Sequence, residues 1–577
     1  MSIKNIADLL VHTLAEVGVK RIYGVVGDSL NGVTEAVRTH GEIEWVGTRH
    51  EEVAAFAASG ESQLTNELAV CAGSCGPGNL HLINGLFDAH RSRTPVLAIA
   101  AHIPSAEIGS GYFQETHPDQ LFKECSHYCE LVSHPDQLPY VIENAIRAAV
   151  GQKGVAVVVL PGDVALQDSP VKSVSPRTSL VPKDPVVLPQ DDEIQALASL
   201  LNESKRVAIF AGRGCAGAHA QLMDLADALK SPIVYALGGK EHVEYDNPYD
   251  VGMTGFIGFE SGYKAMHSCD TLLMLGTDFP YKQFLPHKVK IAQVDIRPEN
   301  LGRRAKLELG VVGDVKETIK ALLPHLQKRD ERHFLDAALK DYKHSRAELD
   351  KLAQPGSHGV IHPQYLTTVV SEKAADDAVF TADVGTPTVW TARYLQMNGK
   401  RRLIGSFTHG SMANAMPQAL GIKKANPERQ VISFSGDGGF SMLMGDLISL
   451  KQHEIPVKVV IFNNGVLGFV ALEMKAAGFV NTGVDLKNPD FSQVAKSVGI
   501  YGERVEDPTD LPAAVDRFLA HEGPAVLDVV TASQELVLPP TIHMDQVKGF
   551  SLWGLRAVMD GQMQHVIDLA KVNLFDR

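Results

Sequence analysis

The sequence predicts an α/β protein made of three doubly wound parallel-sheet domains, followed by an amphipathic C-terminal tail. Two observations predict this fold. Along most of the 577 residues, apolar runs of strand length alternate with patterns of helical length and spacing. Several of these runs end in glycine and polar residues, as parallel strands do where a ligand approaches their carboxyl ends. The length allows about three or four domains with sizeable cores.

The first domain is expected to span residues 1–182. Its strand candidates are KRIYGVVG, EIEWVGT, ELAVCAG, PVLAIAA and GVAVVVLPGD, with helical patterns between them. The stretch 167–190 holds five prolines and little periodicity, so it is predicted to be a linker.

The second domain is expected over 183–338 and contains the strand candidates RVAIFA, DTLLMLG and KIAQVDI. A charged helical stretch over 328–353 leads into the third domain, 339–534. That domain holds the runs QVISFS, VKVVIFN and VLDVVTA, and the tail follows over 535–577.

Composition excludes several classes of protein. A net charge of −14 without a long basic run argues against a nucleic-acid partner. The six cysteines form no CxxC pair and no zinc-like spacing, so buried reduced thiols are expected. The first 20 residues read as an amphipathic helix without the features of a signal peptide, and no apolar window reaches about 18 residues. A cytoplasmic protein is expected.

Polar residues follow two neighbouring strands of the third domain. Asp437 ends QVISFSG, and Asn463 and Asn464 end VKVVIFNN, with one helix-length segment between the two strands. In such a βαβ unit both carboxyl ends open at one sheet edge, so Asp437 and Asn464 are expected to converge. Their oxygens suit Mg²⁺, while Gly438 and Gly439 leave the backbone bare enough for a diphosphate. A lone Asp-Gly turn between strand and helix is also a common structural solution.

The sequence GDG is followed after about two dozen residues by NN. This spacing resembles the thiamine diphosphate motif of the pyruvate oxidase and acetolactate synthase superfamily. The resemblance implies thiamine diphosphate and Mg²⁺ as cofactors, with Asp437, Asn464 and the Val466 carbonyl as metal ligands. It places Met412 beneath the bend of the cofactor. The other residues that it places around thiamine diphosphate are Gly410, Ser411, Gly438, Gly439, Gly465, Leu467, Gly468, Phe469 and Val470.

A second constellation follows the strand EIEWVG. Two acidic residues, Glu51 and Glu52, open the small-residue helix VAAFAASGES. An acidic residue in a first helical turn is usually a surface group favoured by the helix dipole. However, RHEEVAAFAA resembles the segment where this superfamily carries the glutamate that hydrogen-bonds the cofactor's pyrimidine and assists proton transfer. By position Glu51 matches, whereas Glu52 points about 100° away.

In this superfamily the glutamate and the metal motif come from different subunits. The resemblance therefore implies a homo-oligomer, at least a dimer, with a dimer of dimers expected.

The middle domain carries two loops that resemble flavin-contacting loops of the superfamily's oxidases, GMTGFIG and GTDFP. The residues expected to contact FAD are Thr254, Gly255, Phe256, Ile257, Thr277, Asp278, Phe279, Pro280, Tyr281 and, at the ribose, Asp295. The run GRGCAG over 212–217 fits GxGxxG, but no acidic strand end follows at the right spacing, which favours structural glycines. FAD alone does not prove redox chemistry, because acetolactate synthases also bind it.

Four loops look like those of the quinone-linked pyruvate dehydrogenases, also called pyruvate oxidases: RHEEVAAFAA, CAGSCGPGNLHLINGLFDAH, GSGYFQETHP and VLGFVALEMKAAG. This likeness implies Phe113 and Gln114 beside the substrate, Phe469 as an electron relay and Glu473 near pyruvate. The implied reaction is oxidative decarboxylation of pyruvate to acetate and CO₂, with electrons passed through FAD to a membrane quinone.

Three other readings remain open. A phosphate-dependent pyruvate oxidase would make acetyl phosphate and hydrogen peroxide, and an acetolactate synthase would join two substrates without an electron acceptor. A non-catalytic binding protein is expected to lack some of the catalytic and cofactor-binding residues, yet Glu51, Asp437 and Asn464 are all present.

From Val547 onward the tail predicts an amphipathic helix. One stripe of it collects Leu555, Val558, Met559, Met563, Val566, Ile567, Ala570 and Leu574. Pattern alone fits a helix packed on its own protein as well as one bound to a surface, and Gly561 predicts a break. The resemblance favours a lipid surface, bound by apolar burial, and hence a peripheral position on the inner face of the cell membrane.

Overall fold

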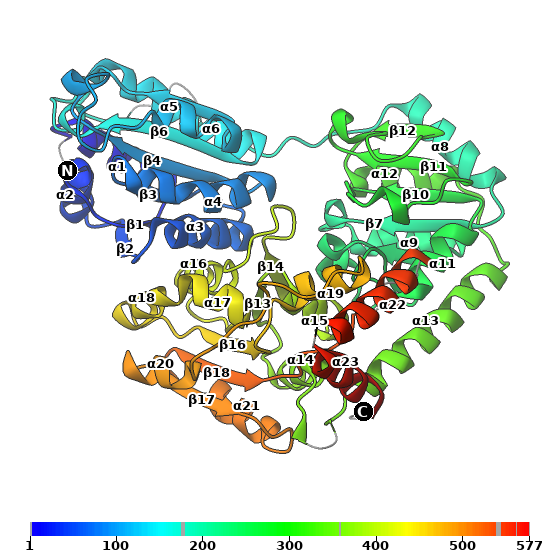
Figure 1. Cartoon of the computed structure of the whole chain (residues 1–577). Coiled ribbons are helices and arrows are strands. Elements are labelled where there is room, and N and C mark those ends of the chain that lie inside the picture. Colours follow the sequence, from blue (N-terminus) through cyan, green and yellow to red (C-terminus); the bar gives the residue numbers. More distant parts are fainter. Residues whose placement is uncertain (1–2, 175–178, 357–358, 538–543, 561, 576–577) are drawn as a thin grey trace.

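The computed structural model describes residues 3–174, 179–356, 359–537, 544–560 and 562–575. Within them the chain forms three parallel six-stranded sheets covered by helices (Figure 1). The first and second sheets lie side by side, in blue and green, and the third lies next to both, in yellow and orange. The predicted α/β class with three parallel sheets is confirmed.

The first sheet has the order β2-β1-β3-β4-β6-β5. Its strands are β1 (Arg21–Gly24), β2 (Glu44–Gly47), β3 (Ala69–Gly73), β4 (Val96–His102), β5 (Tyr128–Leu131) and β6 (Val155–Pro161). Its helices are α1 (Ile6–Glu16), α2 (Asn31–His40), α3 (Glu51–Thr65), α4 (Pro77–Arg91), α5 (Pro118–Leu121), α6 (Leu138–Gln152) and α7 (Gly162–Ala165). Central β4 and β6 are buried along their whole length, as continuous apolar strands between helical layers must be.

The second sheet has the order β12-β11-β10-β7-β8-β9. Its strands are β7 (Val207–Ala211), β8 (Ile233–Tyr235), β9 (Asp250–Met253), β10 (Thr271–Leu275), β11 (Lys290–Asp295) and β12 (Leu309–Val312). Its helices are α8 (Asp191–Glu203), α9 (His219–Leu229), α10 (Lys240–Val243), α11 (Glu260–Ser268), α12 (Val315–Leu322) and the charged α13 (His333–Leu352).

The third sheet has the order β14-β13-β15-β16-β18-β17. Its strands are β13 (Val379–Ala382), β14 (Arg402–Gly405), β15 (Val431–Gly436), β16 (Lys458–Asn463), β17 (Tyr501–Val505) and β18 (Ala525–Val530). Its helices are α14 (Pro363–Lys373), α15 (Thr386–Tyr394), α16 (Ala415–Ala425), α17 (Asp437–Leu443), α18 (Leu447–Gln452), α19 (Gly468–Ala476), α20 (Phe491–Ser497) and α21 (Leu511–Ala520).

The helix predicted between the two polar strand ends is split into α17 and α18 by a 3₁₀ turn over Met444–Asp446. The Asp446 carboxylate accepts hydrogen bonds from the Arg49 backbone N–H (2.8 Å) and the Ser449 hydroxyl (2.6 Å). The turn therefore ties the third domain to the segment just before α3.

Small residues let α3 pack closely between α4 and α16. A Cβ on Gly421 would lie 1.9 Å from the Ala57 carbonyl oxygen, and one on Gly60 would lie 2.5 Å from that of Gln418. The run VAAFAASG is thus an interdomain contact surface, which fixes the N-terminus of α3 where Glu51 stands.

The tail forms α22 (Met544–Met559) and α23 (Met563–Ala570), and α22 packs against α19 (Figure 1). Gly561 and the side chain of Leu574 lie outside the described residues. The inner face of α22 is buried through Trp553 and Ala557, and a Cβ on Gly549 would lie 1.9 Å from the Ala476 carbonyl oxygen.

The outer face of the tail exposes several large apolar side chains. They are Val547, Leu552, Leu555, Val558, Met559, Met563 and Ile567, and the exposed polar residues Lys548, Ser551, Arg556, Asp560 and Gln564 lie among them in the sequence. The tail thus has one packed face, as a helix packed on its own protein would, and one face with exposed apolar side chains; binding of that face to a lipid surface stays a prediction. Among the described residues, no helix has both the length and the apolar character that a bilayer crossing requires.

Candidate active site

The polar ends of β15 and β16 meet, because these strands are neighbours and Gly436 pairs with Phe462. The Gly465 N–H donates to Asp437 Oδ2 at 2.7 Å, and the Gly438 N–H donates to Asp437 Oδ1 at 2.8 Å. Burial raises the pKa of Asp437, and these hydrogen bonds to its charged form oppose that rise.

The donor set at this strand end fits a hard cation. Asn464 lies one residue before Gly465, with its Oδ1 accepting from the Val466 N–H at 3.1 Å. Asp437, Asn464 and Val466 thus place a carboxylate, an amide and a main-chain carbonyl within one loop cluster, which is the chemistry that Mg²⁺ prefers.

Two glycines after Asp437 are required by close packing. A Cβ on Gly438 would lie 2.7 Å from Leu467 Cδ2, and one on Gly439 would lie 2.4 Å from Asp383 Oδ2. Asp383 is buried, and its Oδ2 has no hydrogen-bond partner among the described residues. Burial raises the pKa of Asp383 to about 7. An orphaned polar atom against a glycine loop marks the place where a polar ligand is expected.

A cavity of about 1490 Å³ runs from this loop to the second domain. The predicted thiamine-contacting residues in its wall are Met412, Asp437, Gly438, Gly439, Val466, Leu467, Phe469 and Val470, together with Glu473. Gly410, Ser411, Asn464, Gly465 and Gly468 are not part of that wall. The hydroxyl of Ser411 instead accepts from Asn84 Nδ2 at 3.0 Å, on the side of the first domain.

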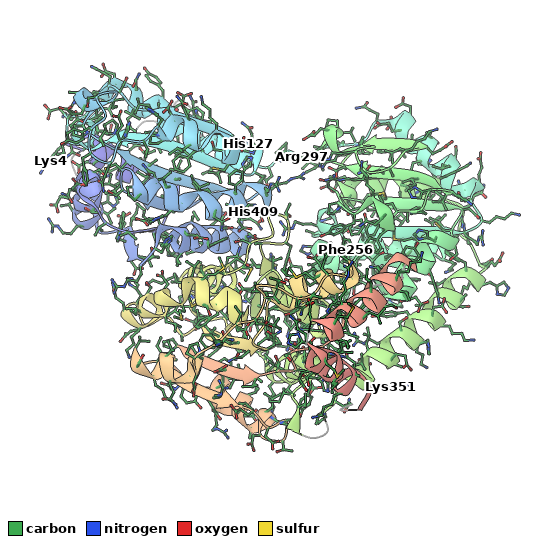
Figure 2. All side chains as sticks on the ribbon, viewed as in Figure 1. Lys4, His127, Phe256, Arg297, Lys351 and His409 are labelled. Carbon is green, nitrogen blue, oxygen red and sulfur yellow. The ribbon has the colours of Figure 1, made fainter. Side chains whose placement is uncertain are left out.

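All ten residues predicted to contact FAD line the same cavity. Phe256 packs edge-on against Tyr281, with ring centroids 4.8 Å apart. Asp295 ends β11, buried, and its Oδ1 accepts from the Arg297 N–H at 2.9 Å. In Figure 2, Arg297 and His127 lie at the facing edges of the second and first domains, and a guanidinium N–H of Arg297 donates to the Gln152 carbonyl at 2.9 Å.

Arg393, on the third domain, holds the loop that is predicted to contact FAD, and the sequence did not indicate this role. It lies buried on α15, and its guanidinium donates to the carbonyl oxygens of Ile257 (2.9 Å) and Gly258 (3.2 Å). Burial lowers the pKa of Arg393 to about 10, which leaves it charged at neutral pH. Because α15 also begins in the cavity wall at Thr386, this side chain joins the two halves of the cavity.

Glu51 lies at the first position of α3, 8% exposed. Its Oε2 lies 2.9 Å from His81 Nδ1, and the His81 ring stacks on His50, whose Nδ1 accepts from the Glu52 N–H. His81 was also missed, since it stands 30 residues further along on α4 and no motif marks it.

The predicted substrate residue Gln114 lies beside the same loop as Glu51, because a Cβ on Gly76 would lie 2.8 Å from Gln114 Cβ and one on Gly78 would lie 3.0 Å from Glu51 Oε1. Gln114 adopts a left-handed backbone (φ 62°) and its Oε1 accepts from the Cys75 thiol at 3.3 Å. Its neighbour Phe113 is 79% exposed. Both residues, like Glu51, are outside the wall of the large cavity, so the predicted site residues of one chain fall into two separate groups.

Three domain families match the chain in the order of its three sheets. They are described as the thiamine pyrophosphate enzyme N-terminal TPP binding domain over residues 4–121, the central domain over 194–322, and the C-terminal TPP binding domain over 383–529. A relative from Bacillus subtilis, named a putative thiamine pyrophosphate-containing protein, is 35% identical over 99% of both chains. The chain belongs to the thiamine pyrophosphate enzyme family.

Other relatives of this thiamine pyrophosphate enzyme differ in sequence identity and in the share of the chain that they cover. A protein of Pseudomonas amyloderamosa named only as an uncharacterized 42.6 kDa protein is 67% identical over 61% of this chain and 89% of its own length. A pyruvate oxidase of Lactiplantibacillus plantarum is 30% identical over 93% of this chain and 90% of its own. Acetolactate synthases are among the relatives too. The protein is therefore a thiamine diphosphate-dependent enzyme of the decarboxylating type.

Proposed function

We propose that this enzyme is a quinone-linked pyruvate dehydrogenase that binds thiamine diphosphate, Mg²⁺ and FAD. Pyruvate and water would give acetate, CO₂, two protons and two electrons, and a membrane quinone would take up the protons and electrons as quinol. One observation carries the proposal. A single cavity is lined both by the Asp437 loop and by the aromatic loops around Phe256 and Phe279.

Thiamine diphosphate would supply an electron sink for decarboxylation, and FAD a two-electron acceptor. The chain would hold the metal through Asp437, Asn464 and the Val466 carbonyl, with Met412 under the cofactor's bend. Phe469 and Glu473 lie one helical turn apart on α19 and both line the cavity, on the same helix face. We assign Phe469 to the electron path and Glu473 to the substrate.

A second copy of the chain would complete each site. The large cavity of one chain is not lined by Glu51, Phe113 or Gln114. The side chain of Phe113 is 79% exposed. A homodimer in which these residues face the Asp437 loop of the partner would bring Glu51 to the pyrimidine ring. A dimer of dimers is the proposed full assembly.

The tail would carry the enzyme to its electron acceptor. The outer face of α22 and α23 exposes large apolar side chains while the inner face is packed, which is the arrangement of an interfacial helix. We therefore place the enzyme in the cytoplasm, peripheral on the inner face of the cell membrane, where a quinone dissolved in lipid is accessible.

Product analysis tests the reaction against its two competitors. The enzyme with all three cofactors is given pyruvate under three conditions: a quinone analogue without oxygen, oxygen with phosphate, and no acceptor. We expect acetate and quinol in the first. Acetyl phosphate with peroxide in the second would favour a phosphate-dependent pyruvate oxidase, and acetolactate in the third would favour an acetolactate synthase such as those among the relatives.

A further inference from the structure

A chain of hydrogen bonds leads from Asp437 away from the large cavity. Asn488 Nδ2 donates to Asp437 Oδ2 at 2.8 Å and to Asn463 Oδ1 at 2.9 Å. Asn463 Nδ2 in turn donates to Asp528 Oδ1 at 2.9 Å. Asp528 is fully buried and its Oδ2 accepts from Arg504 at 2.8 Å. The five side chains form one continuous path.

The orientation of Asn488 follows from its partners. The amide nitrogen of Asn488 faces Asp437, since it donates to both Asp437 Oδ2 and Asn463 Oδ1. Pro489 follows directly and restricts the backbone of Asn488 to extended conformations. The segment before it is fixed as well, because the Leu486 N–H donates to the Gly465 carbonyl at 2.8 Å.

Asn488 and Asn463 also separate two cavities. Both line a second cavity of about 390 Å³ that reaches Arg504, whereas Asp437 lines the large one. The amide of Asn488 therefore stands between the metal-binding carboxylate and a second space on its far side.

We propose that Asn488 is a positioning residue for the metal: it directs the lone pairs of Asp437 toward the large cavity and closes the metal site on the side of the second cavity. The first asparagine of the NN pair, Asn463, has a supporting role, since its carbonyl oxygen anchors the same Asn488 amide. Groups that orient a metal ligand commonly change metal affinity about 10–100-fold when they are lost. The inference rests on the proposed function, in which Asp437 binds Mg²⁺.

Calorimetric titration of Mg²⁺ tests this role. The full chain is stripped of metal, saturated with thiamine diphosphate, and titrated as the unmodified protein, Asn488→Ala and Asn488→Gln. We expect a 10–100-fold weaker Mg²⁺ affinity and faster loss of metal to excess chelator for Asn488→Ala, with partial recovery in Asn488→Gln, which keeps an amide donor.

The control is Asn247→Ala, in the second domain. It also removes an asparagine side chain with two hydrogen bonds, one donated to the Val243 carbonyl and one accepted from the Tyr249 N–H. It should leave Mg²⁺ affinity unchanged. The melting temperature of the metal-free proteins shows whether Asn488→Ala is folded, and Asn488→Gln carries the test if it is not.

The outcomes separate the two claims. If the unmodified chain takes up no Mg²⁺ with thiamine diphosphate, the metal part of the proposed function fails. If it takes up Mg²⁺ and folded Asn488 variants bind it equally well, the positioning role of Asn488 is overturned.

Discussion

Glu51 and Glu52 are neighbours on α3, yet their carboxylates have different partners. Glu51 Oε2 lies 2.9 Å from His81 Nδ1, whereas Glu52 Oε1 accepts from Asn84 Nδ2 at 2.7 Å. Asn84 also donates to Ser411, in the loop that leads to Met412 of the same chain. Two adjacent residues thus belong to two regions, one the proposed pyrimidine half-site and the other the contact between the first and third domains.

This divergence predicts unequal effects of one substitution at two neighbouring positions. Glu51→Gln removes a proton-transferring carboxyl and should lower kcat by about 10²–10⁴-fold. Glu52→Gln keeps an oxygen that can accept from Asn84 and should lower kcat by less than about tenfold. Steady-state pyruvate oxidation under saturating cofactors measures both, and similar losses in the two variants would contradict the assignment of Glu51.

The proposed flavin loop is predicted to depend on Arg393. Arg393→Met removes the donors to Ile257 and Gly258, so the loop loses its attachment to α15. We expect about tenfold weaker FAD binding, as the loss of hydrogen bonds from a charged donor implies. Arg393→Lys should lie between this variant and the unmodified chain. Fluorescence of FAD released on dilution gives the affinity, and an unchanged affinity in folded Arg393→Met would exclude this role.

The second domain should lose stability as pH rises because of Asp250. Burial, and after it the charge of Glu244, raises the pKa of Asp250 to about 7. Since its pKa in the unfolded chain is about 3.9, folding favours the protonated form. The stabilisation is complete below the pKa of the unfolded chain and is lost as pH rises through the pKa of the folded protein. Between these two pKa values the free energy of unfolding falls by about 1.4 kcal/mol per pH unit.

Asp250→Asn should remove that dependence, because the amide cannot titrate and still offers an oxygen to the Gly252 N–H. Melting temperatures of the two proteins, measured at several pH values between about 5 and 8, should converge or cross as pH rises. Parallel curves would show that Asp250 does not titrate in this range.

The outer face of the tail should mediate lipid binding. Leu555 and Met559 are 67% and 85% exposed, so the double variant Leu555→Ser/Met559→Ser changes the outer face and leaves Trp553 packed. Sedimentation with phosphatidylcholine–phosphatidylglycerol vesicles should show at least about a tenfold loss of binding, because two large apolar side chains no longer enter the lipid. A chain ending at residue 546 should behave likewise. Equal binding by all three proteins would refute the membrane role.

The sequence predicts the strand ends better than it predicts their surroundings. Asp437 and Asn464 were located because buried parallel strands are continuous apolar runs, and their carboxyl ends must meet at one edge. Seven strands were not predicted, including β5, whose four residues are mostly half-buried and form no apolar run, and β8, which has only three residues.

The residues that sequence reasoning missed act across long separations. His81 meets Glu51 only because of the register between α3 and α4, and Asn488 meets Asp437 from 51 positions away. Arg393 reaches a loop 136 residues earlier through the packing of two domains. None of these contacts is encoded in local spacing, so periodicity and motifs cannot reveal them. The turn between α17 and α18 likewise has a distant partner, because Asp446 accepts a hydrogen bond from the Arg49 N–H of another domain.

The most direct test of the proposed function follows the flavin itself. The enzyme with thiamine diphosphate, Mg²⁺ and FAD is mixed with pyruvate without oxygen, and the absorbance of the bound flavin is recorded before and after a quinone analogue is added. The account predicts that pyruvate reduces the flavin, that acetate and CO₂ form in equal amounts, and that quinone reoxidises it. A flavin that stays oxidised while pyruvate is consumed to acetolactate would contradict the account.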